Sequence, residues 1–173
     1  MIDIREELQY HVEFATNVLM HEGHFIPMVL IDGEGGRMPV MMNFSNYEEK
    51  DSNYALIKLL ALAYDATQLV MMTESWLTIL DHDGKVERKT EALTVNIVRR
   101  DAQVQANREI VRDADGNIIR LDDDREPTAV TVENRLASLL PKEPVDDYQK
   151  NGARDVLKML NIEPQLMTKP TVH

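Results

Sequence analysis

Three Asp-Gly pairs, each between two apolar runs, constrain the fold of this chain more than any other feature. Tight hairpin turns need a short polar side chain and a residue that tolerates positive φ, and Asp-Gly supplies both. We therefore expect hairpins of an antiparallel sheet between Phe25 and Leu121. The three pairs are Asp32-Gly33, Asp83-Gly84 and Asp115-Gly116.

Alternating or continuous apolar runs around these turns predict the strands. The clearest alternation places Leu93, Val95 and Ile97 on one face and Thr94 and Asn96 on the other, so we expect one core face and one solvated face. Pro27 and Pro39 lie inside the first hairpin, which favours edge positions or bulges there. The predicted strands are 25–31, 37–43, 67–80, 91–100, 104–112 and 117–121.

Helical spacing predicts two main helices. Asp3 followed by Glu6 resembles a capping box, and the helical pattern then continues to Met20 and ends at Gly23. A second helix is expected over 54–64, with its start at Ser45 or at Asp51-Ser52. The fold class is therefore α+β: an antiparallel sheet of about five to six strands packed with two main helices, plus a helical C-terminal extension.

A run of charged residues at 122–127 divides the sequence into an α+β domain, 1–121, and a C-terminal extension, 122–173. Two short helices are expected in the extension, near 132–140 and 146–160. The extension has too few apolar residues to fold alone, so it docks either on the main domain or on something else.

The composition excludes several classes of protein. The chain has a net charge of −11, which disfavours nucleic acid and anionic membrane surfaces as partners. It has no cysteine, which excludes disulfides and thiolate chemistry. No apolar run is long enough for a membrane span. We expect a cytoplasmic protein without a cofactor.

The best candidates for chemistry are His21, His24 and Glu74. Two imidazoles three positions apart can converge on a metal ion, and Glu74 or Asp32 could complete the site. The alternative is a surface histidine pair at a helix C-terminus and a Glu74 paired with Arg99 or Arg100 across the ladder. This alternative is favoured, so we assign no catalytic residue and keep these three only as candidates.

Five arginines on the C-terminal strands offer a basic patch to a nucleotide or an acidic partner, although cross-strand salt bridges are the favoured interpretation. They are Arg99, Arg100, Arg108, Arg112 and Arg120. Apolar residues suited to a protein interface are the single tryptophan, two of the ten methionines and three residues of the last helix. These are Trp76, Met41, Met42, Val156, Leu157 and Leu160.

Three short pieces together resemble a group of uncharacterised bacterial and phage single-domain α+β proteins. They are 24–27, the helix ending Leu62-Ala63, and the strand 70–77 with its Glu-x-Trp. The resemblance covers about residues 1–121 and implies a bacterial or viral context without an assigned activity. Residues 122–173 take no part in it.

These observations favour a non-enzymatic protein-interaction or assembly protein, phage-encoded, acting as a virion component or as an accessory factor that binds a host or viral protein. Homo-oligomerisation is a further expectation, and the location is then the host cytoplasm or the virion. One alternative is a metal-dependent hydrolase that uses His21, His24 and Glu74. The other is an acidic inhibitor that mimics nucleic acid.

Overall fold

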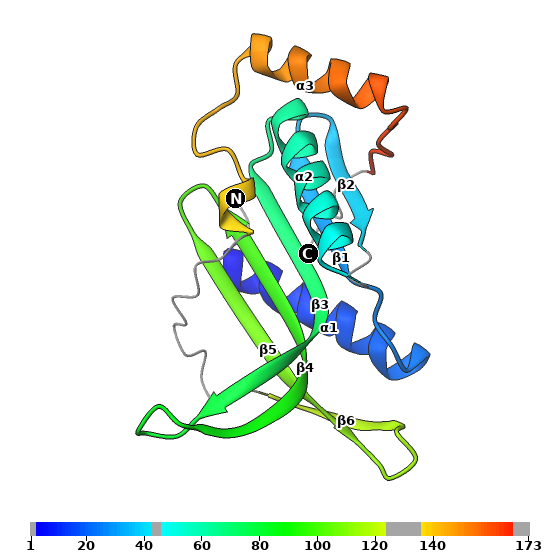
Figure 1. The fold of residues 1–173 in the computed structure, drawn as a ribbon, viewed down its shortest axis with the longest axis vertical. Coiled ribbons are helices and arrows are strands. Elements are labelled where there is room, and N and C mark those ends of the chain that lie inside the picture. Colours follow the sequence, from blue (N-terminus) through cyan, green and yellow to red (C-terminus); the bar gives the residue numbers. More distant parts are fainter. Residues whose placement is uncertain (1–2, 43–45, 124–135, 168–173) are drawn as a thin grey trace. The chain divides into compact units, whose positions relative to one another are not determined.

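The computed structural model describes residues 3–42, 46–123 and 136–167. Within these ranges the elements follow the order helix, hairpin, helix, four strands, short helix, helix (Figure 1). None of the described helices combines the length and the apolar composition that a membrane crossing requires. The elements are α1 (Ile4–Glu22), β1 (Met28–Gly33), β2 (Gly36–Met41), α2 (Tyr47–Ala63), β3 (Gln68–Leu80), β4 (Val86–Arg99), β5 (Gln103–Arg112), β6 (Ile118–Asp123), the 3₁₀ helix η1 (Ala137–Leu139) and α3 (Asp147–Met159).

The six strands form one sheet in the order β2-β1-β3-β4-β5-β6. The β1–β2 and β5–β6 pairs are antiparallel, with Ile31 opposite Met38 and Ile110 opposite Leu121. The predicted α+β class with an antiparallel sheet and a helical C-terminal segment is therefore confirmed. Pro39 lies in β2, at the edge of the sheet, where its missing N–H does no harm.

Contacts between residues group the chain into two units, each built from segments that are distant in sequence. Unit 1 contains residues 1–26, 72–96 and 104–130. Unit 2 contains residues 27–71, 97–103 and 131–173. β3 and β4 each have residues in both units. The predicted division after Leu121 stays a prediction.

In unit 1, α1 covers part of the sheet. The Asp3 side chain accepts a hydrogen bond from the Arg5 amide, and Gly23 ends the helix with φ of 77°, as the sequence predicts. The buried face of α1 carries Val12, Ala15 and Leu19. α1 contacts β6, and Arg108 of β5 donates a hydrogen bond to the Thr16 hydroxyl at 3.1 Å.

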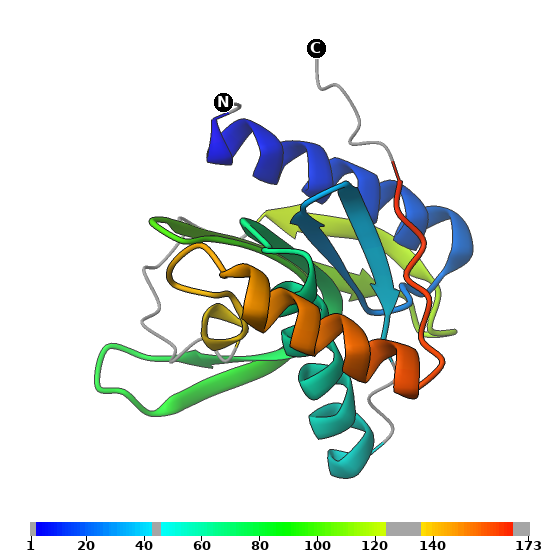
Figure 2. The ribbon, with the colours of Figure 1, turned by 90° about the horizontal axis from the view of Figure 1, so that it is seen from above.

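In unit 2, α2 packs against β1, and α3 packs against α2. Figure 2 shows α3 crossing α2. Leu157 and Ala153 of α3 join the same apolar cluster as residues of the β1–β2 hairpin and of α2, among them Ile31, Met38 and Ile57. The C-terminal segment therefore docks within its own chain, one of the two outcomes expected for it.

Polar contacts fix this docking. Arg154 of α3 donates to the Ala63 carbonyl at 2.8 Å and lies over the Tyr64 ring at 5.5 Å. Lys150 of α3 donates to Glu34 in the β1–β2 turn at 2.8 Å, and this carboxylate is the largest cause that raises the pKa of Lys150. The turn of the β1–β2 hairpin and the C-terminus of α2 therefore both hold α3 through polar contacts.

The start of α2 differs from both predicted positions. Asn46 is the N-cap, and its side chain accepts a hydrogen bond from the Glu49 amide at 2.8 Å. Ser45 lies outside the described residues. The predicted helix near 132–140 is described only from residue 136, and there Ala137–Leu139 forms a single 3₁₀ turn. The predicted 146–160 helix is confirmed, with Asp146 as its N-cap.

Two of the three Asp-Gly turns have the expected geometry. Asp81 Oδ1 accepts from the amides of Asp83 and Lys85, and Asp113 Oδ1 accepts in the same way two and four residues later. Gly84 and Gly116 have φ of 77° and 86°. The hairpin interpretation of these acidic loops is thereby confirmed.

The expectation for Asp32-Gly33 is wrong in detail. Gly33 still belongs to β1 and pairs with Gly36, so the turn consists of Glu34 and Gly35, and Gly35 has the positive φ of 87°. Glycine is needed at 33 for a different reason. A Cβ there would lie 2.3 Å from the Tyr64 carbonyl oxygen.

The expected solvated face of β4 is also wrong. Thr94 and Asn96 are buried, like Leu93 and Val95 on the opposite face. Period-two alternation reports polarity and not exposure, because hydroxyl and amide groups can be buried when they are paired.

Candidate interaction surface

The second half of β3 has a free edge on its β1 side. β1 has 6 residues and β3 has 13, so β1 covers less than half of β3. The Thr67 amide donates to the Asp32 carbonyl, which places the end of β1 beside the start of β3. The stretch 75–80 therefore has β4 as its only neighbouring strand among the described residues.

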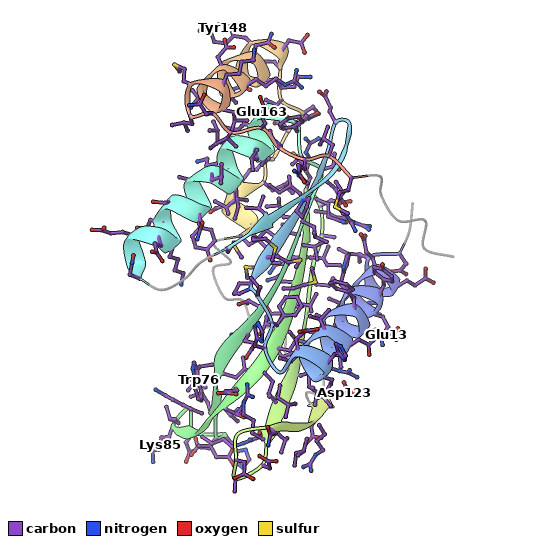
Figure 3. The ribbon with its side chains drawn as sticks, turned by 90° about the vertical axis from the view of Figure 1, so that its right-hand side faces the viewer. Glu13, Trp76, Lys85, Asp123, Tyr148 and Glu163 are labelled. Atoms are coloured by element: carbon purple, nitrogen blue, oxygen red, sulfur yellow. The ribbon has the colours of Figure 1, made fainter. Side chains whose placement is uncertain are left out.

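This free stretch, which we call the β3 edge (residues 75–80), exposes apolar side chains. Trp76 is 70 % exposed, and Leu80 is also exposed. Side chains alternate along a strand, so Trp76, Thr78 and Leu80 lie on one face. Because Asp81 and Lys85 are hydrogen-bonded across the turn, the exposed Val86 lies opposite Leu80. Figure 3 shows Trp76 on the β3–β4 hairpin, with Lys85 near its tip.

The hairpin that carries this surface is held from behind by polar side chains. Ser75 and Thr94 hydroxyls lie 2.7 Å apart, and Thr94 donates to Asn107 of β5 at 2.9 Å. Asn96 donates to Gln105 at 3.3 Å. This row of hydrogen bonds links β3, β4 and β5 and explains why Thr94 and Asn96 are buried.

An ion pair braces β4 against β5 next to the hairpin. Arg88 contacts both carboxylate oxygens of Glu109, one of them at 2.8 Å, and the Thr90 hydroxyl donates to the same carboxylate. The hydrogen bond from Arg88 is the largest cause that holds the pKa of Glu109 below its ordinary value of 4.5, against the opposing effect of burial.

Glu74, a predicted catalytic candidate, has structural partners. Its Oε1 atom accepts a hydrogen bond from the Phe25 amide at 2.5 Å, and its Oε2 atom lies 3.5 Å from the Arg112 guanidinium. The expected pairing with Arg99 or Arg100 is wrong, because these two arginines bind Gln68 and Asp65 instead. Glu74 ties the segment after α1 to β3.

Within the part of the chain that the structure describes, the two candidate histidines belong to no group of metal-ligating side chains. The His21 side chain is 86 % exposed and lies 3.7 Å from the Glu22 carboxylate, while His24 contacts the Glu22 carbonyl. Among residues 3–42, 46–123 and 136–167, no three His, Asp or Glu side chains come together as metal ligands do. The described geometry therefore gives the hydrolase hypothesis no metal site, and the hypothesis stays untested.

The five arginines contact acids or carbonyl groups, and Arg108 and Arg112 form the cross-strand salt bridges of the favoured interpretation. Arg108 binds Asp123, Arg112 binds Glu91 and Arg120 binds Asp122. Arg99 and Arg100 line an open hollow of about 400 Å³ beside the segment 137–142, but Arg100 is held by Asp65 and two carbonyl groups. Both arginines of this hollow thus have protein partners.

The residues predicted for interaction divide into exposed and buried groups. Trp76, Met41, Val156 and Leu160 are exposed, and Met42 and Leu157 are buried in the unit 2 core. Sequence reasoning missed Leu80 and Val86. The signal for them was a run without charge, from Ser75 to Leu80, that ends directly at a turn.

The other end of the sheet is protected, in contrast to the β3 edge. On the outer side of β2, Arg37 exchanges two backbone hydrogen bonds with Met167, at 2.9 and 2.7 Å. Two residues further, Pro39 has no N–H to offer. Protection by proline and by a covering segment is the usual treatment of a sheet edge.

Among the described residues, the fold defines an α+β protein whose sheet has a protected edge at β2 and an open stretch of strand edge at residues 75–80. Comparisons with protein-family models, curated proteins and solved structures give no match to this chain. Its function is therefore argued from its own residues.

Proposed function

We propose that this chain is a non-enzymatic protein-interaction or assembly protein that binds an extended segment of another protein along the β3 edge. The observation that carries the proposal is the exposed Trp76 near the start of residues 75–80, a stretch that has no charged residue and, among the described residues, only β4 as a neighbouring strand. A partner strand would pair with the backbone of residues 75–80 and pack alternate side chains against Trp76 and Leu80.

The β3 edge has none of the features that prevent strand pairing. Its sequence, Ser-Trp-Leu-Thr-Ile-Leu, contains no proline and no charged residue. Such a segment associates readily with other strands when it is left open. A chain that protects β2 but leaves residues 75–80 open supports a role for that stretch in binding.

The support of the hairpin fits this role. A surface binds with least entropic cost when it is already ordered, and the hydrogen bonds through Thr94 and Asn107 and the Arg88–Glu109 pair hold β4 and β5 in place behind β3. Trp76 itself contributes little to the core. A large aromatic side chain that is exposed in the free protein and rigidly placed is typical of a binding hot spot.

The setting follows from the resemblance to bacterial and phage proteins. We infer a phage-encoded virion component or accessory factor, with a host or viral protein as the partner. The charges of the hairpin tip have both signs, Asp81 and Asp83 beside Lys85. We therefore expect the surface to bind a partner segment that has apolar side chains at alternate positions.

A site-specific photo-crosslinking experiment tests the proposal. A photoreactive phenylalanine analogue replaces Thr78 on the exposed face of the β3 edge, and in a matched control it replaces the equally exposed Ile119 of β6. Cells that contain the protein in its native setting are irradiated, and the adducts are identified by mass spectrometry.

We expect one defined partner protein at position 78, absent at position 119 and lost when Trp76→Ala is added. Equal adducts at the two positions, or none at 78, would overturn the proposal. An adduct between two copies of this chain at position 78 would also overturn it, because the edge would then serve self-association.

A further inference from the structure

We propose that α3 pairs with α3 of a second copy of this chain, antiparallel and about a two-fold axis beside Gly152. This inference concerns unit 2 and is independent of the binding proposed at the β3 edge. It starts from a face of α3 that no described residue covers.

The uncovered face carries three exposed apolar side chains along the helix, and the exposed Asp155 lies at its border. Tyr148 is 90 % exposed and Met159 is 74 % exposed, and Val156 between them is also exposed. The spacing of four, four and three residues from Tyr148 through Gly152 and Val156 to Met159 places these residues on one side of the helix. We call this set the α3 stripe. It lies next to the buried row of Ala153 and Leu157.

No described residue lies close enough to require glycine at position 152. Glycine inside a helix costs roughly 0.5 to 1 kcal/mol relative to alanine, and Gly152 lies near the middle of α3. A Cβ at this position would meet no atom within 4 Å, and its backbone is helical. A second helix that crosses here could approach more closely than over any larger side chain.

The charges beside the stripe suit a two-fold antiparallel pair. Asp147 and Lys158 are about three helical turns apart, so they lie on the same flank of α3, and they are almost equally far from Gly152. In an antiparallel pair about a two-fold axis, the same flanks face each other, and Asp147 of each copy meets Lys158 of the other. Both side chains are exposed.

The charge of α3 itself does not oppose a contact between two copies. The whole chain carries a charge of −11, whereas residues 146–160 contain three acids and three bases. The segment is therefore neutral, and like-charge repulsion between copies does not disfavour a contact through it.

The expected dimer is weak, because one pair of helices of this length buries less than the roughly 800 Å² per partner of a standard stable interface. Sedimentation equilibrium of the full chain from about 1 µM to about 1 mM covers the dissociation constants expected for such contacts. We expect a monomer–dimer equilibrium within this range. A monomer at all concentrations would overturn the inference.

The variant Gly152→Ala distinguishes a dimer interface on α3 from a helix face that contacts only water. Alanine strengthens the helix, so the melting temperature of the monomer should rise, while the added Cβ separates the two helices and weakens the dimer at least tenfold. Met159→Lys should also weaken the dimer, whereas Met20→Lys, on the exposed part of α1, should not. Unchanged association in Gly152→Ala would overturn the inference.

Charge reversal tests the antiparallel register. Asp147→Lys alone and Lys158→Glu alone place like charges opposite each other, so each variant should dimerise less than the parent chain. A mixture of the two variants should form heterodimers, because both contacts are then of opposite charge. A dimer that ignores these changes but is lost in Trp76→Ala would assign self-association to the β3 edge and refute the role of α3.

Discussion

Glu74 and Trp76 lie two residues apart on the same face of β3, and they have opposite environments. The Glu74 carboxylate is held by the Phe25 amide and faces Arg112, whereas the Trp76 side chain is 70 % exposed. On the face that carries these two side chains, the described contacts of β3 with Phe25 and with β5 therefore end between Glu74 and Trp76. Beyond it, the strand offers its edge and its largest side chain to solvent.

Trp76→Ala should leave the fold unchanged. An exposed side chain outside special features alters the free energy of unfolding by about 0.5 kcal/mol or less, whereas Leu93→Ala, at a buried position of β4, should cost about 2 to 5 kcal/mol. Urea denaturation of both variants measures the difference. A large loss of stability in Trp76→Ala would show that Trp76 belongs to the core.

Gly33→Ala should be strongly destabilising, although Gly33 has an ordinary backbone conformation. The new Cβ would collide with the Tyr64 carbonyl, and either β1 or the end of α2 must move, at a cost of about 1 to 3 kcal/mol. Gly84→Ala is the matched control, because its Cβ meets open space and only the positive φ is strained. Thermal unfolding should show the larger decrease for Gly33→Ala.

Asp32→Ala should cost about 3 to 5 kcal/mol, because it leaves a buried guanidinium without its carboxylate. Arg37 donates to both oxygens of Asp32 at 2.7 Å, and both residues are buried. Arg120→Ala removes an exposed ion pair with Asp122 and should cost at most about 1 kcal/mol. Equal effects in chemical denaturation would contradict this ranking.

His11→Leu should stabilise the protein. His11 is buried in α1, and neither ring nitrogen has a hydrogen-bond partner among the described residues, since Glu7 Oε1 lies at 3.7 Å. An unsatisfied buried polar group costs about 1 to 3 kcal/mol, and leucine removes it. Gln9→Leu, at an exposed site of the same helix, controls for helix propensity. A lower melting temperature for His11→Leu would reveal a buried partner for the imidazole.

Acid should weaken unit 1 through Glu109. The Arg88 hydrogen bond lowers the pKa of Glu109 in the folded state, so the stabilisation is fully present above the ordinary value of 4.5 and is lost as the pH falls through the lowered value. Arg88→Ala removes the largest cause of the shift. As the pH is lowered from about 5 to about 3, the urea midpoint of Arg88→Ala should fall less steeply than that of the parent or of Lys89→Ala.

The local elements could be predicted from the sequence because their causes are local. The cap of α1 by Asp3, its end at Gly23 and the two Asp-x-Asp-Gly turns depend on residues within one helical turn or one hairpin. The strand bounds were close for the same reason. Asp32-Gly33 was misplaced, because the Tyr64 carbonyl, distant in sequence, requires glycine there. The starts of α2 and β4 also differ from the predicted ones.

The arrangement of polar groups could not be predicted, because it depends on which strands become neighbours. Thr94 is buried because Ser75 and Asn107 lie on either side of it. Glu74 faces Arg112 and not Arg99 because β5 brings Arg112 within reach. The exposed edge of β3 depends on how much longer β3 is than β1. The sequence leaves the ends of each strand uncertain by a few residues, so this difference could not be predicted.

The bridge between Arg37 and Met167 has a consequence for the order of synthesis. β1 and β2 leave the ribosome early, yet the edge of β2 gains its covering segment, and the core beneath gains Leu157, only when residues 157–167 have followed. Until then the nascent chain carries an incomplete apolar core and an uncovered strand. The apolar core of unit 2 is therefore complete only after residues 157–167 have been synthesised.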